Sequence, residues 1–257
     1  KALWGWGVLF MIFYLIMGAF VFSNNLPKNL PNSVYVGYTS GWYALINLFT
    51  LSSLAISISY SIMFATHSLS YCFRFTNLKP MGYLLNKIFS SIIVGIILSL
   101  IIMVTAYSLF SYRFGFNIAP ANLPFTLLTL VISSIFMFSF STLLVLILIN
   151  YLGLRNQSFV SFIPLILGFI FGFSQLSLTL PDLVLYASPY TAITGLLFHG
   201  YSGSDVPISI GSGPTSGVLD VNYLLISLIS WTIALLLIDS YLLRRIKPRM
   251  VEEMRQL

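Results

Sequence analysis

The loop after His199 holds the stretch closest to a catalytic motif. It reads Gly-Tyr-Ser-Gly over 200–203, the G-x-S-G spacing that presents a serine nucleophile in an intramembrane hydrolase. Such a serine, here Ser202, needs a histidine from another helix at the same depth to take its proton. The only other histidine, His67, is predicted on the opposite side of the molecule. The Gly/Ser-rich surroundings explain the match better than catalysis does, and an intramembrane hydrolase stays as an alternative.

No other residues have the spacing of a metal or nucleotide site. Glu252 and Glu253 form a carboxylate pair in a charged tail, but no histidine lies near them. Cys72 is the single cysteine, which excludes an internal disulfide and a thiolate zinc site. The sequence contains no G-x-x-x-x-G-K-[ST] motif, so no P-loop is present. We therefore expect a chain that binds no cofactor and is not catalytic alone.

The composition predicts an integral membrane protein. Hydrophobic residues make up 58% of the 257 residues and charged residues only 7%, whereas a soluble domain carries about 25% charged residues. The surface of such a chain cannot be covered by polar groups, so its main partner is membrane lipid. The net charge of +6 arises from short basic clusters beside apolar runs, which indicates topology signals and no nucleic acid.

The apolar runs predict one all-α domain, residues 1–257, with six transmembrane helices. Each run is about 20 residues long, the length that crosses the hydrocarbon core. The predicted helices cover residues 3–22, 42–64, 88–110, 125–149, 159–176 and 223–243. A further apolar segment, Leu183–Phe198, is too short to cross and is interrupted at Ser188 and Pro189. We interpret it as one or two short re-entrant helices that dip into the outer leaflet before the sixth helix.

The basic residues predict the orientation. With the N-terminus inside, ten Lys and Arg residues fall on the cytoplasmic side, and only Lys28 and Arg113 fall outside. Cytoplasmic loops carry such an excess of basic residues. We therefore expect a multi-pass protein of the cell membrane with both termini in the cytoplasm.

A few residues inside the runs could line a path or hold helices together. Ser53, Ser57 and Ser61 recur every fourth residue, so their hydroxyls share one helical face, where close packing is favoured over a pathway. Gly168 and Gly172 form a small-xxx-small pair that allows close helix approach. We expect this contact to lie between subunits. Asp239 is the one acidic residue inside a run, and we expect it to pair with Arg244 or to reach the inner interface.

The stretch 67–87, between the second and third runs, predicts a short cytoplasmic helix with two faces that can each bind another surface. Leu69, Cys72, Phe73 and Thr76 fall on one face, which we assign to the membrane bundle. The opposite face is assigned to a cytoplasmic partner and contains Tyr71, Arg74, Phe75 and Leu78. We expect Pro80 and Gly82 to end this helix. An interfacial loop anchored by aromatic residues is the alternative.

This pattern resembles the membrane permease of ABC-2 type transporters. The segment LKPMGYLLNK (78–87) is similar to a motif that leads into the third helix of that family, and ASPYT (187–191) is similar to an element after its fifth helix. The resemblance implies two permease subunits, forming a homo- or heterodimer. Each would be served by a separate ATPase subunit that binds ATP and Mg²⁺.

The resemblance also implies roles for particular residues. The coupling helix that seats on the ATPase would use Tyr71, Arg74, Phe75, Leu78 and Lys79. Gly168 and Gly172 fit the subunit contact, and the serine stripe fits the pathway. Polar, uncharged walls suit an amphipathic or hydrophobic cargo such as a lipid, drug or peptide. A membrane scaffold without transport activity is the remaining alternative.

Overall fold

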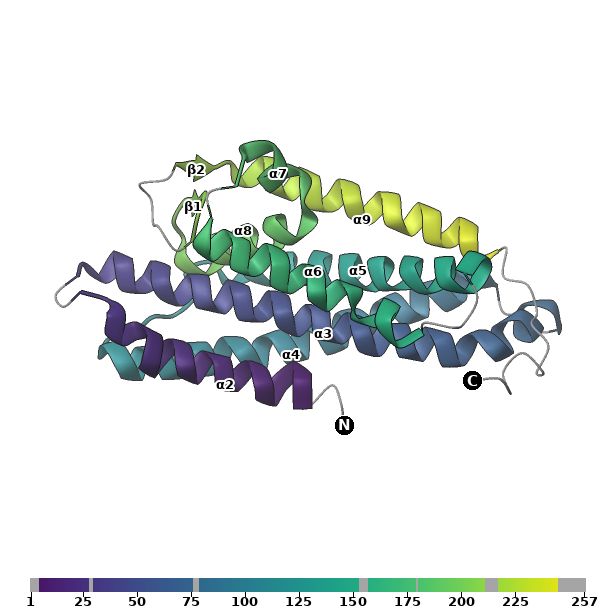
Figure 1. The fold of residues 1–257 in the computed structure, drawn as a ribbon, viewed down its shortest axis with the longest axis horizontal. Helices are drawn as coiled ribbons and strands as arrows, with labels where there is room; N and C mark the ends of the chain where they lie inside the picture. Colours follow the sequence, from purple (N-terminus) through teal and green to yellow (C-terminus); the bar gives the residue numbers. More distant parts are fainter. Residues whose placement is uncertain are drawn as a thin grey trace.

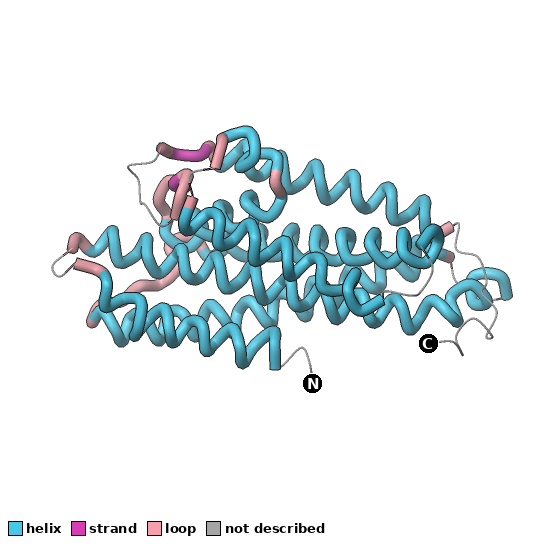
Figure 2. The backbone as a smooth tube through the Cα atoms, in the orientation of Figure 1, coloured by secondary structure: helices cyan, strands magenta, loops and turns pink. Residues whose placement is uncertain are grey.

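The protein is an elongated bundle of helices (Figures 1 and 2). The computed structural model describes residues 5–27, 30–75, 79–152, 157–178, 180–210 and 217–244. Six helical segments within these residues are long and apolar enough to cross a membrane. Their apolar spans are Gly7–Asn25, Asn32–Ala65, Met81–Phe114, Leu123–Tyr151, Phe159–Leu176 and Val221–Leu243. The prediction of a multi-pass membrane protein with six candidate spans is confirmed.

The first span is built from short helical pieces that change their hydrogen-bond pattern along the way. These pieces are η1 (Gly5–Leu9), α2 (Phe10–Ile16), η2 (Met17–Val21) and η3 (Phe22–Asn25). The span packs against the next helix at Gly18, whose carbonyl accepts a 2.8 Å hydrogen bond from the Tyr38 hydroxyl. A Cβ on Gly18 would lie 2.7 Å from the Trp42 ring, so only glycine permits this approach.

The second and third spans are much longer than the sequence predicts. Helix α3 (Asn32–Phe75) has 44 residues and α4 (Pro80–Phe114) has 35, which correspond to about 66 and 52 Å. The hydrocarbon core is only about 30 Å thick. Helix α3 begins at Asn32, ten residues before the predicted start at 42, so the expected loop is shorter than predicted. The expected separate helix after residue 67 is wrong, because α3 continues without a break to Phe75.

Pro80 begins a helix here, although the sequence predicts that it ends one. It occupies the first turn of α4, with Lys79 as the extended N-cap residue before it. Proline is favoured at this point, because the first amides of a helix have no partner inside it and the ring presets the helical φ. Gly82 lies inside α4 and is also not a stop.

Helices α3 and α5 (Leu123–Ile147) form the centre of the bundle. In each, 67% of the apolar span is buried within the chain, compared with 22% for α9 (Val221–Leu243) at the edge. Helix α5 continues as η4 (Leu148–Leu152), and α6 (Gln157–Ser177) then runs back along α3. Helix α9 packs mainly on α5, so its outer side is left for lipid or a partner.

Two short helices fill the space before α9. Helix α7 (Asp182–Ala187) ends at Ser188, and α8 (Pro189–Ser202) leaves in a new direction. The Thr191 hydroxyl is within hydrogen-bond distance of the carbonyl oxygens of Leu185 and Ser188, at 2.5 and 2.7 Å, and so ties the two helices across the break. The predicted interruption at this point is therefore present.

Helix α8 is buried inside the bundle. The ring of Tyr190, at its start, contacts aromatic rings of α5 and α6. At its end, the Tyr201 hydroxyl donates a 2.9 Å hydrogen bond to the carbonyl of Ile118, in the loop between α4 and α5. A two-residue pair of antiparallel strands, β1 (Val206–Pro207) and β2 (Val218–Leu219), then covers this end (Figure 1).

The small-xxx-small pair on α6 lies against α3 of the same chain. A Cβ on Gly168 would be 2.6 Å from the Ser52 hydroxyl, and one on Gly172 would be 2.6 Å from the Leu45 side chain. Both glycines are buried at this contact. The close approach is present, but it lies within one chain, whereas the sequence analysis expects it between subunits.

Replacing Gly168 by Leu tests this packing. Rotation of the Ser52 hydroxyl would make room for a Cβ but not for a whole Leu side chain against α3. We therefore expect a loss of about 2–3 kcal/mol and a thermal midpoint lower by about 5 °C in detergent. The matched control is Gly82→Leu, because a Cβ on Gly82 meets no atom within 4 Å. Equal thermal midpoints for the two variants would contradict the assigned contact.

Candidate functional site

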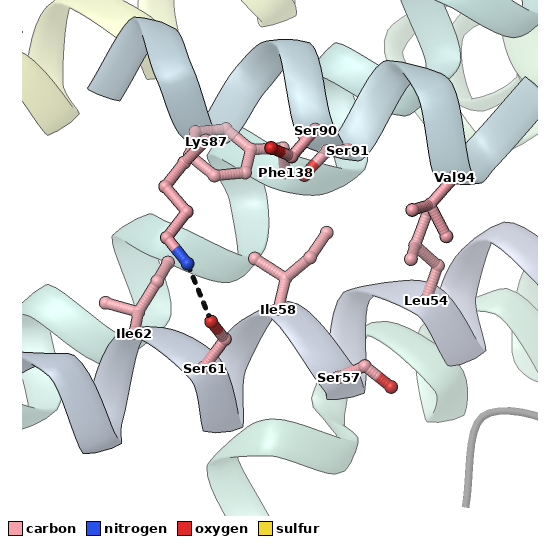
Figure 3. A pocket seen from close by; sticks show the side chains of 10 residues that line it. All are labelled: Leu54, Ser57, Ile58, Ser61, Ile62, Lys87, Ser90, Ser91, Val94 and Phe138. Atoms are coloured by element: carbon pink, nitrogen blue, oxygen red, sulfur yellow. Dashed lines mark hydrogen bonds between the residues drawn. The ribbon is translucent and has the colours of Figure 1, made fainter. Parts of the chain in front are cut away.

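A cleft between α3 and α4 gathers polar side chains beside apolar walls (Figure 3). It has a volume of about 210 Å³, and Phe138 of α5 closes its inner side. The polar members are Lys87 and four serines, and none of the lining residues is acidic. The lining residues are Leu54, Ser57, Ile58, Ser61, Ile62, Lys87, Ser90, Ser91, Val94 and Phe138.

Lys87 is the cation of the cleft. Its Nζ donates a 3.0 Å hydrogen bond to the Ser61 hydroxyl across the two helices and lies 6.0 Å from the centre of the Tyr83 ring. An ammonium group has three N–H donors, so two remain for a ligand. The apolar pattern predicts that Lys87 lies before the third helix, as a topology signal. In the structure it lies two turns inside α4, because that helix begins at Pro80.

The serine stripe of α3 is divided between two environments. Ser53 is buried, and its hydroxyl donates a 2.8 Å hydrogen bond to the Thr50 carbonyl in the same helix. That bond fits the packing interpretation. Ser57 and Ser61 line the cleft, so only these two of the three pathway candidates face open space. The cleft also needs Ser90 and Ser91 of α4, which the sequence analysis does not single out.

The bundle interior holds polar groups that the chain does not satisfy. Among the described residues, the Ser52 hydroxyl has no hydrogen-bond partner, and the amide of Asn47 has only the Tyr43 hydroxyl to interact with. All three residues are buried on α3. Sequence reasoning missed Asn47, although it is the only amide in the second apolar run. A buried amide with so few partners is costly, so a water molecule or a rearranged helix in this layer would stabilise it.

Asp239 is buried and unpaired. Its side chain is 0% exposed, and neither carboxylate oxygen has a hydrogen-bond partner. Arg244 is exposed to solvent. The expectation that Asp239 pairs with Arg244 is therefore wrong, because the carboxylate is buried within the bundle and Arg244 is exposed.

The coupling residues are only partly within the described structure. The side chains of Tyr71 and Arg74, and Leu78 as a whole, lie outside the described residues. Phe75 is 80% exposed at the end of α3, and Lys79 is exposed at the start of α4. Phe73 points the other way and packs edge-to-face on Tyr83, with ring centres 6.2 Å apart. Phe73 and Phe75 thus lie on opposite sides of the helix, as the helical wheel predicts.

The hydrolase motif does not form a nucleophile and base. The Nδ1 atom of His199 is 2.8 Å from the Ser204 carbonyl, and its ring packs on Phe125. The Ser202 hydroxyl is instead bonded within its own turn, to the Ser204 amide and hydroxyl at 3.1 and 2.8 Å. These bonds are those of a helix C-terminus, which ends at Gly203 with a φ of 69°.

The Asp239→Asn substitution tests whether the carboxylate is ion-paired in the folded protein. Asn has the same shape without charge, so the thermal midpoint should stay equal or rise. An ion-paired carboxylate would instead lose about 3–5 kcal/mol on this substitution. Asp220→Ala serves as the reference, because it removes the side chain that caps α9 through the Asn222 amide and should cost about 1 kcal/mol. A larger loss for Asp239→Asn than for Asp220→Ala would show a hidden partner.

Comparisons with protein-family models, with curated proteins and with solved structures gave no match. Within the described residues, the features that bear on function are the six candidate spans, the long central helix α3 and the polar cleft between α3 and α4.

Proposed function

We propose that this chain is the membrane subunit of an ATP-driven exporter of the ABC-2 type, with ATP hydrolysed by a separate subunit. The observation that carries the proposal is the continuity of α3. Its apolar span ends at Ala65, but the helix goes on to Phe75. These ten additional residues extend it by about 15 Å at the end of the bundle where α4 begins.

The extension of α3 suits contact with a partner outside the membrane. Phe75 is 80% exposed at its tip, and the exposed Lys79 follows it. An exposed aromatic residue beside a basic one is the composition of a binding anchor. Because the backbone hydrogen bonds of α3 are unbroken, a displacement at Phe75 is transmitted to Ser61 in the cleft and to Asn47 in the interior.

The lack of ionisable residues in most spans supports an external energy source. Carriers driven by ion gradients place ionisable groups at mid-membrane to couple the two movements. Here Lys87 and Arg113 lie toward the two ends of α4, and Asp239 lies within one turn of the end of α9. The cargo is an amphipathic or hydrophobic molecule, which suits a cleft with four serines and apolar walls.

A second permease subunit would pack on the outer side of α6. The inner side is occupied by the contact of Gly168 and Gly172 with α3. The outer side presents large exposed apolar side chains at helical spacing, namely Phe159, Phe162, Ile166, Ile170 and Phe173. Lipid also covers such a surface, so the pairing is part of the proposal and follows from the resemblance to the exporter family.

Retention of the ATPase tests the function. The chain is purified from its native membrane with mild detergent, and the companion is identified by ATP hydrolysis and mass spectrometry. Phe75→Ala should lower the amount of companion at least fivefold without lowering the thermal midpoint, because the side chain is exposed.

Phe64→Ala is the matched control for this experiment. Phe64 is 77% exposed on the same helix, but it lies within the apolar span, so its loss should leave the ATPase bound. Purification of an intact chain without any ATPase would overturn the proposed function. An equal loss of ATPase from both variants would show that the ATPase does not bind at the tip of α3.

The topology of α7 and α8 is tested by a tag. We propose that the two helices enter and leave the membrane on the outer side, with the termini in the cytoplasm. An epitope inserted after Ser202, where α8 ends, should then react with antibody in intact cells, while a tag at the C-terminus should react only after permeabilisation. Reaction of the first tag only in permeabilised cells would reverse this arrangement.

A further inference from the structure

The length of α4 allows the position of the cleft to be compared with the thickness of a bilayer. About 20 residues of a helix cross the hydrocarbon core, and α4 has 35. With its apolar part centred in the bilayer, roughly seven residues extend beyond the core at each end. Lys87 is the eighth residue of α4, so its ammonium group lies at the boundary between headgroups and acyl chains.

The polar side of the cleft has the chemistry of a phosphate site. Lys87 keeps two N–H donors after its bond to Ser61. Ser57 and Ser90 also line the cleft, but the Ser90 hydroxyl donates to the Asn86 carbonyl, so Lys87 is the main donor. Charge-assisted hydrogen bonds between an ammonium group and a phosphate oxygen are stronger than neutral ones. No lining residue is acidic, so no carboxylate in the cleft competes for the cation.

The apolar side continues from the cleft along the lipid-facing surface of α4. Ser90, Ile93 and Ile97 share one helical face at i, i+3 and i+7. Ile93 is 58% exposed and Ile97 is 50% exposed, and both lie deeper along the span than Ser90. A molecule with its phosphate at Lys87 would therefore have an apolar track for its chains toward the middle of the bilayer.

We propose that this cleft binds the phosphate headgroup of an anionic membrane phospholipid, with an acyl chain along Ile93 and Ile97. Lys87 holds the phosphate, and Ser61 orients the ammonium group. The site does not depend on the proposed transport function, because a lipid can occupy it whether it is cargo or a resident component of the bundle.

Lipid retention tests the site. The full chain is reconstituted in vesicles of phosphatidylcholine with one fifth phosphatidylglycerol, and the lipids that remain bound after extraction are counted by native mass spectrometry. Lys87→Gln should lower the retained phosphatidylglycerol about tenfold, the effect of losing a charged hydrogen bond. Lys87→Arg should keep it, because the charge and the donors remain.

Two controls distinguish lipid binding in the cleft from nonspecific attraction between positive charges and anionic lipid. Arg244→Gln removes one positive charge at the exposed end of α9, far along the chain from the cleft, and should change retention less than twofold. Ser57→Leu keeps Lys87 but fills the cleft, and should lower retention even if Lys87→Gln does not fold. Equal losses for Arg244→Gln and Lys87→Gln would overturn the proposal, as would normal retention in Ser57→Leu.

A soluble competitor distinguishes a lipid from a free phosphate. Glycerol 3-phosphate carries the same phosphate without acyl chains. Added in millimolar amounts to the vesicles before extraction, it should leave the retained phosphatidylglycerol unchanged. Full displacement would show a site for a soluble phosphate and would overturn the lipid assignment.

Discussion

The whole structure depends on the rule that backbone N–H and C=O groups cannot be left unpaired in lipid. An unpaired group costs several kcal/mol there, so a chain crosses the bilayer as a helix whose hydrogen bonds are all internal. This chain applies the rule most fully in α3, which stays helical for 44 residues and packs against α4, α5, α6 and α8. The other helices take their places around that axis.

The same rule explains how the many hydroxyl groups are tolerated. Thr50, Ser134 and Thr142 each donate to the carbonyl four residues earlier, at 2.8–2.9 Å, so their polar atoms are satisfied within one helix. Serine and threonine therefore carry little functional information when buried in this bundle. The buried groups that make no such bond are the informative ones, among them the Ser52 hydroxyl and the carboxylate of Asp239.

The existence of the six spans and the break at Ser188 could be predicted from the sequence, because both depend on local hydrophobicity and on proline. The ends of α3 and α4 could not. A polar residue such as Lys87 ends an apolar run, but it does not end a helix, since helix propensity and neighbouring helices allow the helix to continue. The error mattered for the site: Lys87 changed from a loop residue to a residue facing Ser61.

Contacts between residues far apart in the chain also could not be predicted from the sequence. The pair Gly168 and Gly172 indicates close packing but does not identify the helix that packs there. The sequence alone cannot distinguish a helix of the same chain from a helix of a second subunit. Asp239 illustrates the same limit, since the spacing to Arg244 says nothing about which way each side chain turns. Only the packing of α9 on α5 decides that the carboxylate is inside.

The glycine contact between α6 and α3 also restricts how the bundle can change shape. The side chains of Ser52, Leu45 and Phe49 on α3 fill the space left by the two glycines of α6. Interlocked surfaces of this kind resist sliding, so the two helices tend to shift as a single body. A tilt of α3 would therefore carry α6 with it and would swing the row of Phe and Ile side chains on its far side. A tilt of α3 caused at its end thus becomes a sideways motion of the exposed surface of α6.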